Sequence, residues 1–212
     1  TYILTGNKNF VTEPSNASRT LLMDLDTCEW DDELLSFLEI PKRVLPKIQD
    51  SFSNFGETKD IGFLPDGIPI TCILGDQQAA LFGQTCFEPG EIKNTYGTGC
   101  FMLMNTGSKP VLSNKGLLTT IAYSIDGQVT YALEGSVFVA GSAIQWLRDQ
   151  LEFFPEAKES EQLAMDVDDN FGVVVVPAFL ICFFFFTILN GRETRCLWSL
   201  CKMLSLCVRS IT

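Results

Sequence analysis

The chain has 212 residues, of which 46% are hydrophobic and 19% are charged. This composition is typical of a globular protein with a sizeable core and excludes a disordered chain. The net charge of −11 argues against nucleic acid as a partner, because phosphate binding needs a basic face. The chain contains no histidine, so proton transfer near neutral pH must use another group.

The first predicted elements are two short helices. Residues 30–33 offer a cap and an acidic first turn for a helix over residues 34–38. Pro41 and Pro46 bracket a second helix over residues 42–45. Further on, the β-branched residues 68–74 predict a short buried strand, and residues 77–84 have the composition of a helix.

Asp76 lies where this strand passes into this helix. In α/β folds, ligands bind at the carboxyl ends of strands. Asp76 could therefore act as a general base toward an alcohol or as part of a magnesium site. The alternative is purely structural, because an aspartate directly before a helix also suits the N-cap position.

Beyond a predicted turn at residues 88–90, our candidate domain boundary, strands prevail. Residues 92–96 and 100–104 predict two strands joined by Gly97-Thr98-Gly99, and residues 117–125 and 128–133 predict two more around Asp126-Gly127. Apolar spacing predicts a helix over residues 135–151, followed by a helix over 157–167 and a strand over 172–176. This succession predicts an α/β protein with a mixed sheet.

Three positions in this second half could contact a ligand. The glycines around Thr98 would let the backbone and the Thr98 hydroxyl approach an anion, or they form only a turn. Gly141 could admit a ligand or a neighbouring helix. Gln145, one turn further on, could hydrogen-bond a base or a ribose, or it is simply exposed.

The eight cysteines contain no pair with the spacing of a zinc knuckle. Together with the absence of a secretory leader in these residues, they predict a reducing, cytoplasmic compartment. Each cysteine is expected to act as a small buried hydrophobe.

A resemblance to a known family joins these observations. It rests on residues 16–20, 75–77, 79–84, 93–107, 116–120, 131–136 and 144–149, within a likeness that runs from about residue 5 to residue 179. These segments resemble the FGGY carbohydrate-kinase family, and within it the enzymes that phosphorylate glycerol. The long central block around Asp76 and Thr98 favours glycerol over another FGGY sugar, which is the alternative substrate.

The resemblance implies an actin-like, ribonuclease-H-like ATPase fold, with parts of two mixed-sheet domains and an active site between them. Residues 1–89 would be the C-terminal part of the family's N-terminal domain, and residues 90–179 the N-terminal part of its C-terminal domain. The implied cofactors are ATP and Mg²⁺, and the full-length family is homo-oligomeric. Asp76 matches the catalytic base and a possible Mg²⁺ ligand, Gln77 matches a glycerol contact, and Thr98, Gly141 and Gln145 match nucleotide-binding positions.

The family's phosphate-binding hairpin, with its magnesium aspartate, has no match in these 212 residues, nor do its adenine-binding glycine and asparagine. We therefore expect this chain alone to be inactive. A non-catalytic, truncated isoform is the alternative to an enzyme.

Residues 180–212 form an apolar, cysteine-rich tail outside the resemblance. The nearly continuous apolar stretch at residues 173–189 approaches the roughly 20 residues that span a bilayer, so a membrane-associated chain is one reading. Because residues 173–179 already match a buried strand of the family, we favour a non-native tail, such as a translated intron or a frameshift.

Overall fold

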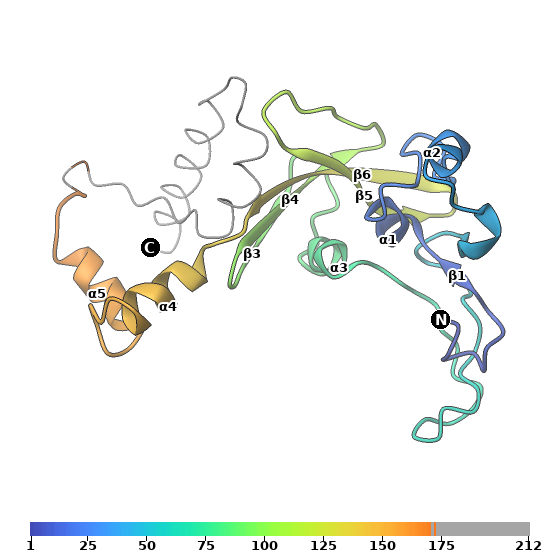
Figure 1. The fold of residues 1–212 in the computed structure, drawn as a ribbon, viewed down its shortest axis with the longest axis horizontal. Helices are drawn as coiled ribbons and strands as arrows, with labels where there is room; N and C mark the ends of the chain where they lie inside the picture. Colours follow the sequence, from blue (N-terminus) through green and yellow to red (C-terminus); the bar gives the residue numbers. More distant parts are fainter. Residues whose placement is uncertain (171, 173–212) are drawn as a thin grey trace. The chain divides into compact units, whose positions relative to one another are not determined.

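The computed structural model describes residues 1–170 and residue 172. Its helices are α1 (Pro14–Ser18), α2 (Asp32–Phe37), the 3₁₀ turn η1 (Lys42–Val44), α3 (Asp76–Gly83), α4 (Gly141–Asp149) and α5 (Glu159–Met165) (Figure 1). Its strands are β1 (Val11–Thr12), β2 (Lys47–Ile48), β3 (Ile92–Tyr96), β4 (Cys100–Gly107), β5 (Leu118–Ile125) and β6 (Gln128–Val137). Helices in this described part of the chain are all too short or too polar to span a bilayer. The predicted strand at 172–176 and the stretch at 173–189 lie outside the described residues, apart from residue 172.

The strands form two sheets. β1 and β2 make a short parallel pair, and the larger sheet has the order β3-β4-β6-β5. The predicted hairpin around Asp126 and Gly127 is confirmed: β5 and β6 run antiparallel, and Ile125 pairs with Gln128. Asp126 and Gly127 have φ angles of 50° and 75°, the left-handed conformation that a two-residue hairpin turn requires. The predicted strands on either side of Thr98 are confirmed as β3 and β4.

Contacts divide the chain into two compact units. Unit 1 comprises residues 1–93 and 102–135, and unit 2 comprises residues 94–101 together with the chain from residue 136 onward. The domain limits 1–89 and 90–179 predicted from the sequence stay a prediction.

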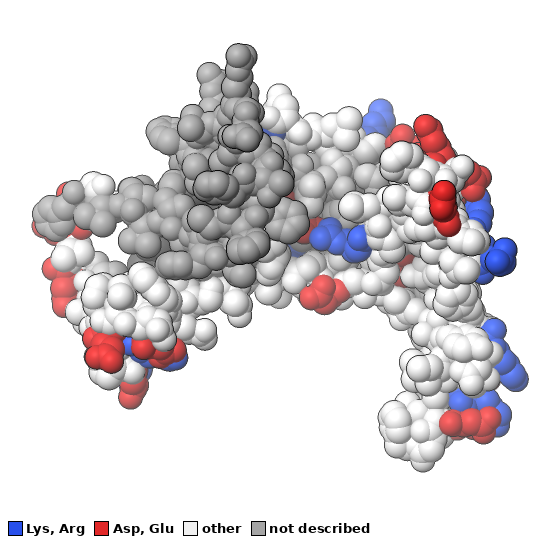
Figure 2. Space-filling view, in the orientation of Figure 1, with Lys and Arg blue, Asp and Glu red and all other residues white. Residues whose placement is uncertain are grey.

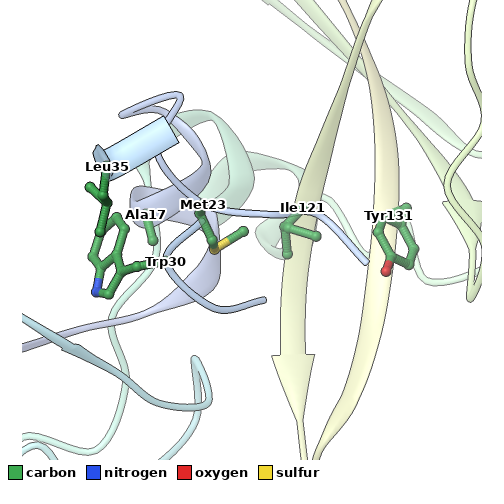
Figure 3. Packing of buried hydrophobic residues seen from close by; sticks show 6 residues of the cluster. All are labelled: Ala17, Met23, Trp30, Leu35, Ile121 and Tyr131. Atoms are coloured by element: carbon green, nitrogen blue, oxygen red, sulfur yellow. The ribbon is translucent and has the colours of Figure 1, made fainter. Parts of the chain in front are cut away.

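The core of unit 1 contains two hydrophobic clusters that meet β5. Figure 3 shows the first cluster, which unites α1, α2 and the β5-β6 hairpin through Ala17, Met23, Trp30, Leu35, Ile121 and Tyr131. The second cluster joins α3 to the sheet through Leu81, Cys86, Leu103, Ala122, Tyr123 and Ala132. Because α1 and α3 both pack against β5, the middle of this strand is buried without interruption.

The prediction of a buried strand over residues 68–74 is wrong. These residues make only isolated bridges, from Pro69 to Glu57 and from Cys72 to Phe52, and the Ile68 side chain is 42% exposed. The hydrogen bonds that flank the bridge at Pro69, Ile70 N to Gly56 O (2.8 Å) and Thr58 N to Ile68 O (2.9 Å), do not continue into a longer ladder. Single backbone hydrogen bonds, such as Ile73 N to Ser51 O (3.0 Å), hold the segment in place instead.

The remaining predicted helices are confirmed with changed limits. α2 and α5 lie where helices were expected, and the helix predicted over residues 42–45 is the single 3₁₀ turn η1. The helix predicted from residue 135 begins only at Gly141, because the chain as far as Val137 continues β6. Val137 fits the helical spacing and the strand equally well, so periodicity placed it in the wrong element.

The cysteine prediction is confirmed in part. Among the described cysteines, all of which are free thiols, Cys86 and Cys100 are buried as expected of small hydrophobes. Cys28 is half-buried, and burial raises the pKa of its thiol to about 11. Cys72 is exposed and contradicts the expectation, because its segment is not a buried strand.

Candidate functional site

Asp76 occupies the first position of α3, and Gly75 is the N-cap residue. The alternative interpretation of Asp76 as the N-cap is therefore wrong, and no side chain caps this helix. The Asp76 carboxylate is exposed to solvent in the first turn, where the partial positive charge of the helix N-terminus favours a negative group. Asp76 is thus available to a ligand, since its carboxylate is not used in capping.

A buried carboxylate fixes the backbone just before α3. Glu13, the N-cap of α1, is completely buried. Its oxygens accept hydrogen bonds from Ser15 N (2.8 Å), Ser15 Oγ (2.6 Å), Asn16 N (2.7 Å), Asn16 Nδ2 (2.6 Å) and Ser51 Oγ (2.8 Å). Ser15 Oγ in turn accepts a hydrogen bond from Gly75 N (2.9 Å). The position of the α3 N-terminus is therefore tied to Glu13.

The same network reaches β5. Ser51 N donates to Ser124 O (3.0 Å), and Ser124 N donates to Ser51 Oγ (3.0 Å). Asp50 accepts hydrogen bonds from Ser124 Oγ and from Gly127 N (2.8 Å) at the β5-β6 turn. The polar network around the start of α3 is thus hydrogen-bonded to β5 and to the β5-β6 turn.

Gly75 leaves room for the side chain of Gln78. A Cβ atom there would lie 2.6 Å from Gln78 Oε1. Gln78 is buried, and its Nε2 donates to Ile121 O in β5 (3.3 Å), which holds the first turn of α3 against the sheet. A larger residue before Asp76 would therefore have to displace the Gln78 side chain from this position.

Gln77, the second residue of α3, contacts a buried lysine. Lys93 of β3 is 4% exposed, and its Nζ donates a short hydrogen bond to Gln77 Oε1. Gln77 Nε2 lies 3.4 Å from Asp76 Oδ2. Burial lowers the pKa of Lys93, and the negative charges of Asp76 and Glu134 oppose this shift. Sequence reasoning did not single out Lys93, because nothing in its local sequence signals burial.

Unit 1 also contains an ion pair between Arg19 and Glu134. Arg19, at the end of α1, donates from Nη1 to Glu134 Oε2 (2.6 Å) and from Nη2 to Glu134 Oε1 (3.2 Å). The Glu134 side chain is 5% exposed and that of Arg19 is 46% exposed. Such a bidentate ion pair holds both side chains in a defined orientation.

Other ion pairs lie at the surface. Figure 2 shows Lys and Arg as well as Asp and Glu side chains on the visible face of the described residues. The surface ion pairs include Lys42–Asp32, Lys59–Asp66 and Arg148–Asp149, in which only Arg148 is partly buried. Solvent screens such pairs, so we attribute neither stability nor function to them.

In unit 2, the turn at Thr98 packs against the start of α4. Thr98 O accepts hydrogen bonds from Ala140 N (2.8 Å) and Ser142 N (3.2 Å), and Gly97 O accepts one from Gly141 N (3.0 Å). A Cβ atom at Gly141 would lie 2.5 Å from Gly97 O. Gly141 therefore stands at the first position of α4, not inside a helix as predicted, and its size permits this close contact.

The candidate residues fall into two groups. Asp76 and Gln77 are neighbours in unit 1, while Thr98 and Gly141 are brought together in unit 2, with Gln145 further along α4. The side chains of Thr98 and Gln145 are exposed. Their predicted ligand contacts stay predictions. Within residues 1–170 and 172, no three acidic or cysteine side chains gather as a metal-binding cluster would.

Two family models match the chain. The N-terminal domain of the FGGY family of carbohydrate kinases matches residues 1–83, and its C-terminal domain matches residues 92–193. The chain belongs to the FGGY family of carbohydrate kinases. The fold class predicted from the sequence, the actin-like, ribonuclease-H-like fold of these kinases, is thereby confirmed.

Individual FGGY proteins give the same result. Glycerol kinases of Bacillus thuringiensis (strain Al Hakam) and Bacillus anthracis (strain CDC 684 / NRRL 3495) are each 59% identical to the chain over 177 residues. These residues are 84% of this chain but 36% of each relative. The chain therefore spans little more than a third of the length of the curated relatives it matches.

Solved structures agree in fold. The Plasmodium falciparum glycerol kinase, crystallised with ADP, has a TM-score of 0.76 and 42% identity, and the match covers 84% of this chain and 36% of that one. A xylulose kinase from Rhodospirillum rubrum has a TM-score of 0.70 at 22% identity and covers 84% of this chain and 37% of its own. The latter likeness shows the fold alone.

Proposed function

We propose that this chain carries part of the active site of an ATP-dependent glycerol kinase, an enzyme that forms glycerol 3-phosphate. The observation that supports this most strongly is the 59% identity to the Bacillus glycerol kinases, which includes the region of Asp76 and Gln77 that the sequence resemblance rests on. The exposed carboxylate at the first position of α3 is compatible with the role of a general base.

In this proposal, Asp76 accepts the proton of the terminal hydroxyl of glycerol. The hydroxyl oxygen attacks the terminal phosphorus of ATP, a new P–O bond forms, and the bond to the ADP oxygen breaks. Phosphoryl transfer depends on positioning and on charge stabilisation more than on a strong nucleophile, so an aspartate suffices in a chain without histidine. Gln77 would contact the substrate beside Asp76.

Thr98, Gly141 and Gln145 would contact the nucleotide, from the turn and helix that pack together in unit 2. Mg²⁺ would neutralise charge on the phosphates. A carboxylate such as Asp76 suits one ligand position of this ion, which usually takes one or two protein carboxylates and completes its shell with water and phosphate oxygens. The chemistry of the residue therefore fits the ion.

A nuclear magnetic resonance titration of the 212-residue chain tests this proposal. Glycerol should shift the amide and side-chain signals of Asp76 and Gln77, and ADP with Mg²⁺ should shift those of Thr98, Gly141 and Gln145. Xylulose and gluconate serve as competitors for the alternative of another FGGY sugar. A chain whose Gln77 responds to xylulose and not to glycerol would contradict the glycerol assignment.

The 36% coverage of the relatives favours one alternative, a non-catalytic chain that keeps the fold without turnover. The assay is ATP-dependent glycerol phosphorylation by the 212-residue chain. We expect no turnover, because most of the relatives' length has no counterpart in it. Measurable activity that Asp76→Asn removes would contradict this expectation.

Homo-oligomerisation and a cytoplasmic location are part of the same proposal, because they follow from the family resemblance. Membrane association through residues 173–189 concerns positions outside the described residues and stays a prediction.

A further inference from the structure

Lys93 is a buried cation that the proposed reaction does not use. It lies in β3, is 4% exposed, and directs its Nζ to Gln77 Oε1. Burial of an ammonium group costs free energy unless polar partners compensate it. A buried lysine at this position therefore calls for a reason.

The contact decides which way the Gln77 amide faces. The oxygen and nitrogen of a glutamine amide are nearly interchangeable in shape, and their orientation is set by hydrogen-bond partners. An ammonium group has donors only, so it accepts no hydrogen bond from an NH₂ group. Lys93 therefore requires Gln77 Oε1 to face it, and Gln77 Nε2 is directed elsewhere.

The NH₂ group of Gln77 is thereby placed beside the Asp76 carboxylate. Gln77 Nε2 lies 3.4 Å from Asp76 Oδ2, near the limit of a hydrogen bond. The two side chains present one donor and one acceptor within reach of each other. This pair is the complement of a hydroxyl group, which donates its proton and accepts through its oxygen.

We propose that Lys93 is a positioning residue that holds the Gln77 amide with its NH₂ group toward the ligand, so that the site selects an alcohol oxygen as hydrogen-bond acceptor. The identity of the ligand in this proposal rests on the proposed function. The orientation of the Gln77 amide rests only on its contact with Lys93. The negative charges of Asp76 and Glu134 favour the protonated form of the buried Lys93, against the effect of burial.

Side-chain amide relaxation in the 212-residue chain tests the proposal. In the wild-type chain, the Gln77 NH₂ group should be as rigid as the backbone, whereas the exposed Gln145 should be mobile. Lys93→Met should make Gln77 as mobile as Gln145, and Lys93→Arg, which retains donors only, should restore rigidity. Lys109→Met, at an exposed lysine, is the matched control and should change nothing.

A second measurement does not depend on the folding of a variant. In the wild-type chain, a nuclear Overhauser contact should join the Lys93 ε-methylene protons to the side chain of Gln77. A Gln77 amide that is mobile in the wild type, or the absence of this contact, would overturn the proposal.

Glycerol affinity separates this proposal from the proposed function. If the chain binds glycerol, Lys93→Met should weaken binding about tenfold, the loss of one charge-assisted hydrogen-bond arrangement, and Lys93→Arg should recover most of it. Equal affinity in wild type and Lys93→Met would overturn the positioning role. If no variant binds glycerol, the proposed function fails, and the relaxation data alone decide the role of Lys93.

Discussion

At the scale of the residue, the completely buried carboxylate of Glu13 is the polar centre of unit 1. It accepts hydrogen bonds from backbone and side-chain donors of three residues, and one of these donors, Ser15 Oγ, also accepts a hydrogen bond from Gly75 N. A buried anion is stable only when such donors surround it. The geometry of the α3 N-terminus therefore depends on a residue far from it in sequence.

Glu13→Gln should lower the free energy of unfolding by about 1–3 kcal/mol, because the new NH₂ group would face donors and leave at least one of them unsatisfied. Urea unfolding followed by circular dichroism measures this change. Glu88→Gln, at an exposed glutamate, is the control and should be neutral. Equal stability of both variants would show that the network around Glu13 is not needed.

The pKa of Lys93 gives a second test at this scale. Burial lowers this pKa from the ordinary value of 10.5, and the charge of Asp76 is the largest opposing influence. Asp76→Asn should therefore lower the Lys93 pKa further, which titration of its side-chain nitrogen signal measures. The folded chain binds fewer protons than the unfolded chain between the lowered value and 10.5, so the contribution of Lys93 to stability rises with pH across this window. A Lys93 pKa at or above 10.5 would contradict its burial.

At the scale of the element, the turn at Thr98 and the start of α4 form one packed unit. The carbonyl groups of Gly97 and Thr98 accept hydrogen bonds from amides at the α4 N-terminus, which otherwise lack partners. Gly141 allows the two backbones to approach this closely. Any nucleotide contact from Thr98, Gly141 or Gln145 depends on this arrangement.

Gly141→Ala should destabilise the chain by about 1–3 kcal/mol, because the added Cβ atom would overlap Gly97 O and force the backbones apart. Gly83→Ala is the matched control: nothing lies within 4 Å of a Cβ atom there, and alanine is the better helix former by about 1 kcal/mol. Thermal unfolding of both variants compares them. A neutral Gly141→Ala variant would refute the close packing of turn and helix.

The elements differ in how far the sequence predicted them, for physical reasons. The β5-β6 hairpin and α2 carry local signals, Asp126-Gly127 and Asp31, that require little from the rest of the chain. Residues 68–74 have strand propensity but form only isolated bridges within the part of the chain that the structure describes, and pairing is not a local property. The start of α4 was misplaced because Val137 suits two periodicities.

The candidate site was predictable in the same uneven way. Asp76 and Thr98 lie within contiguous motifs that the resemblance covers, so one sequence sufficed to single them out. Glu13 and Lys93 act through contacts that join segments far apart in the chain, and nothing in their local sequence signals burial. Only the fold brings these residues to the first turn of α3.

At the scale of the whole molecule, membership of the FGGY family and the exposed Asp76 carboxylate at the start of α3 both support the proposed kinase site. Both FGGY domains have matching segments in this chain, yet the chain corresponds to 36% of the glycerol kinases it resembles. The residues that it does contain carry the proposed base and its supporting contacts. Their competence for catalysis can therefore be separated from the activity of the 212-residue chain.

Glycerol phosphorylation by a chimera measures this competence most directly. In the chimera, residues 1–170 of this chain replace the matching segment of the Bacillus thuringiensis glycerol kinase. A second chimera carries Asp76→Asn as its only further change. We predict that the chimera phosphorylates glycerol from ATP and that Asp76→Asn lowers kcat by about 10²–10⁴-fold, the usual contribution of a general base. A folded chimera without activity, or an Asp76→Asn chimera as active as its parent, would contradict the assignment of Asp76.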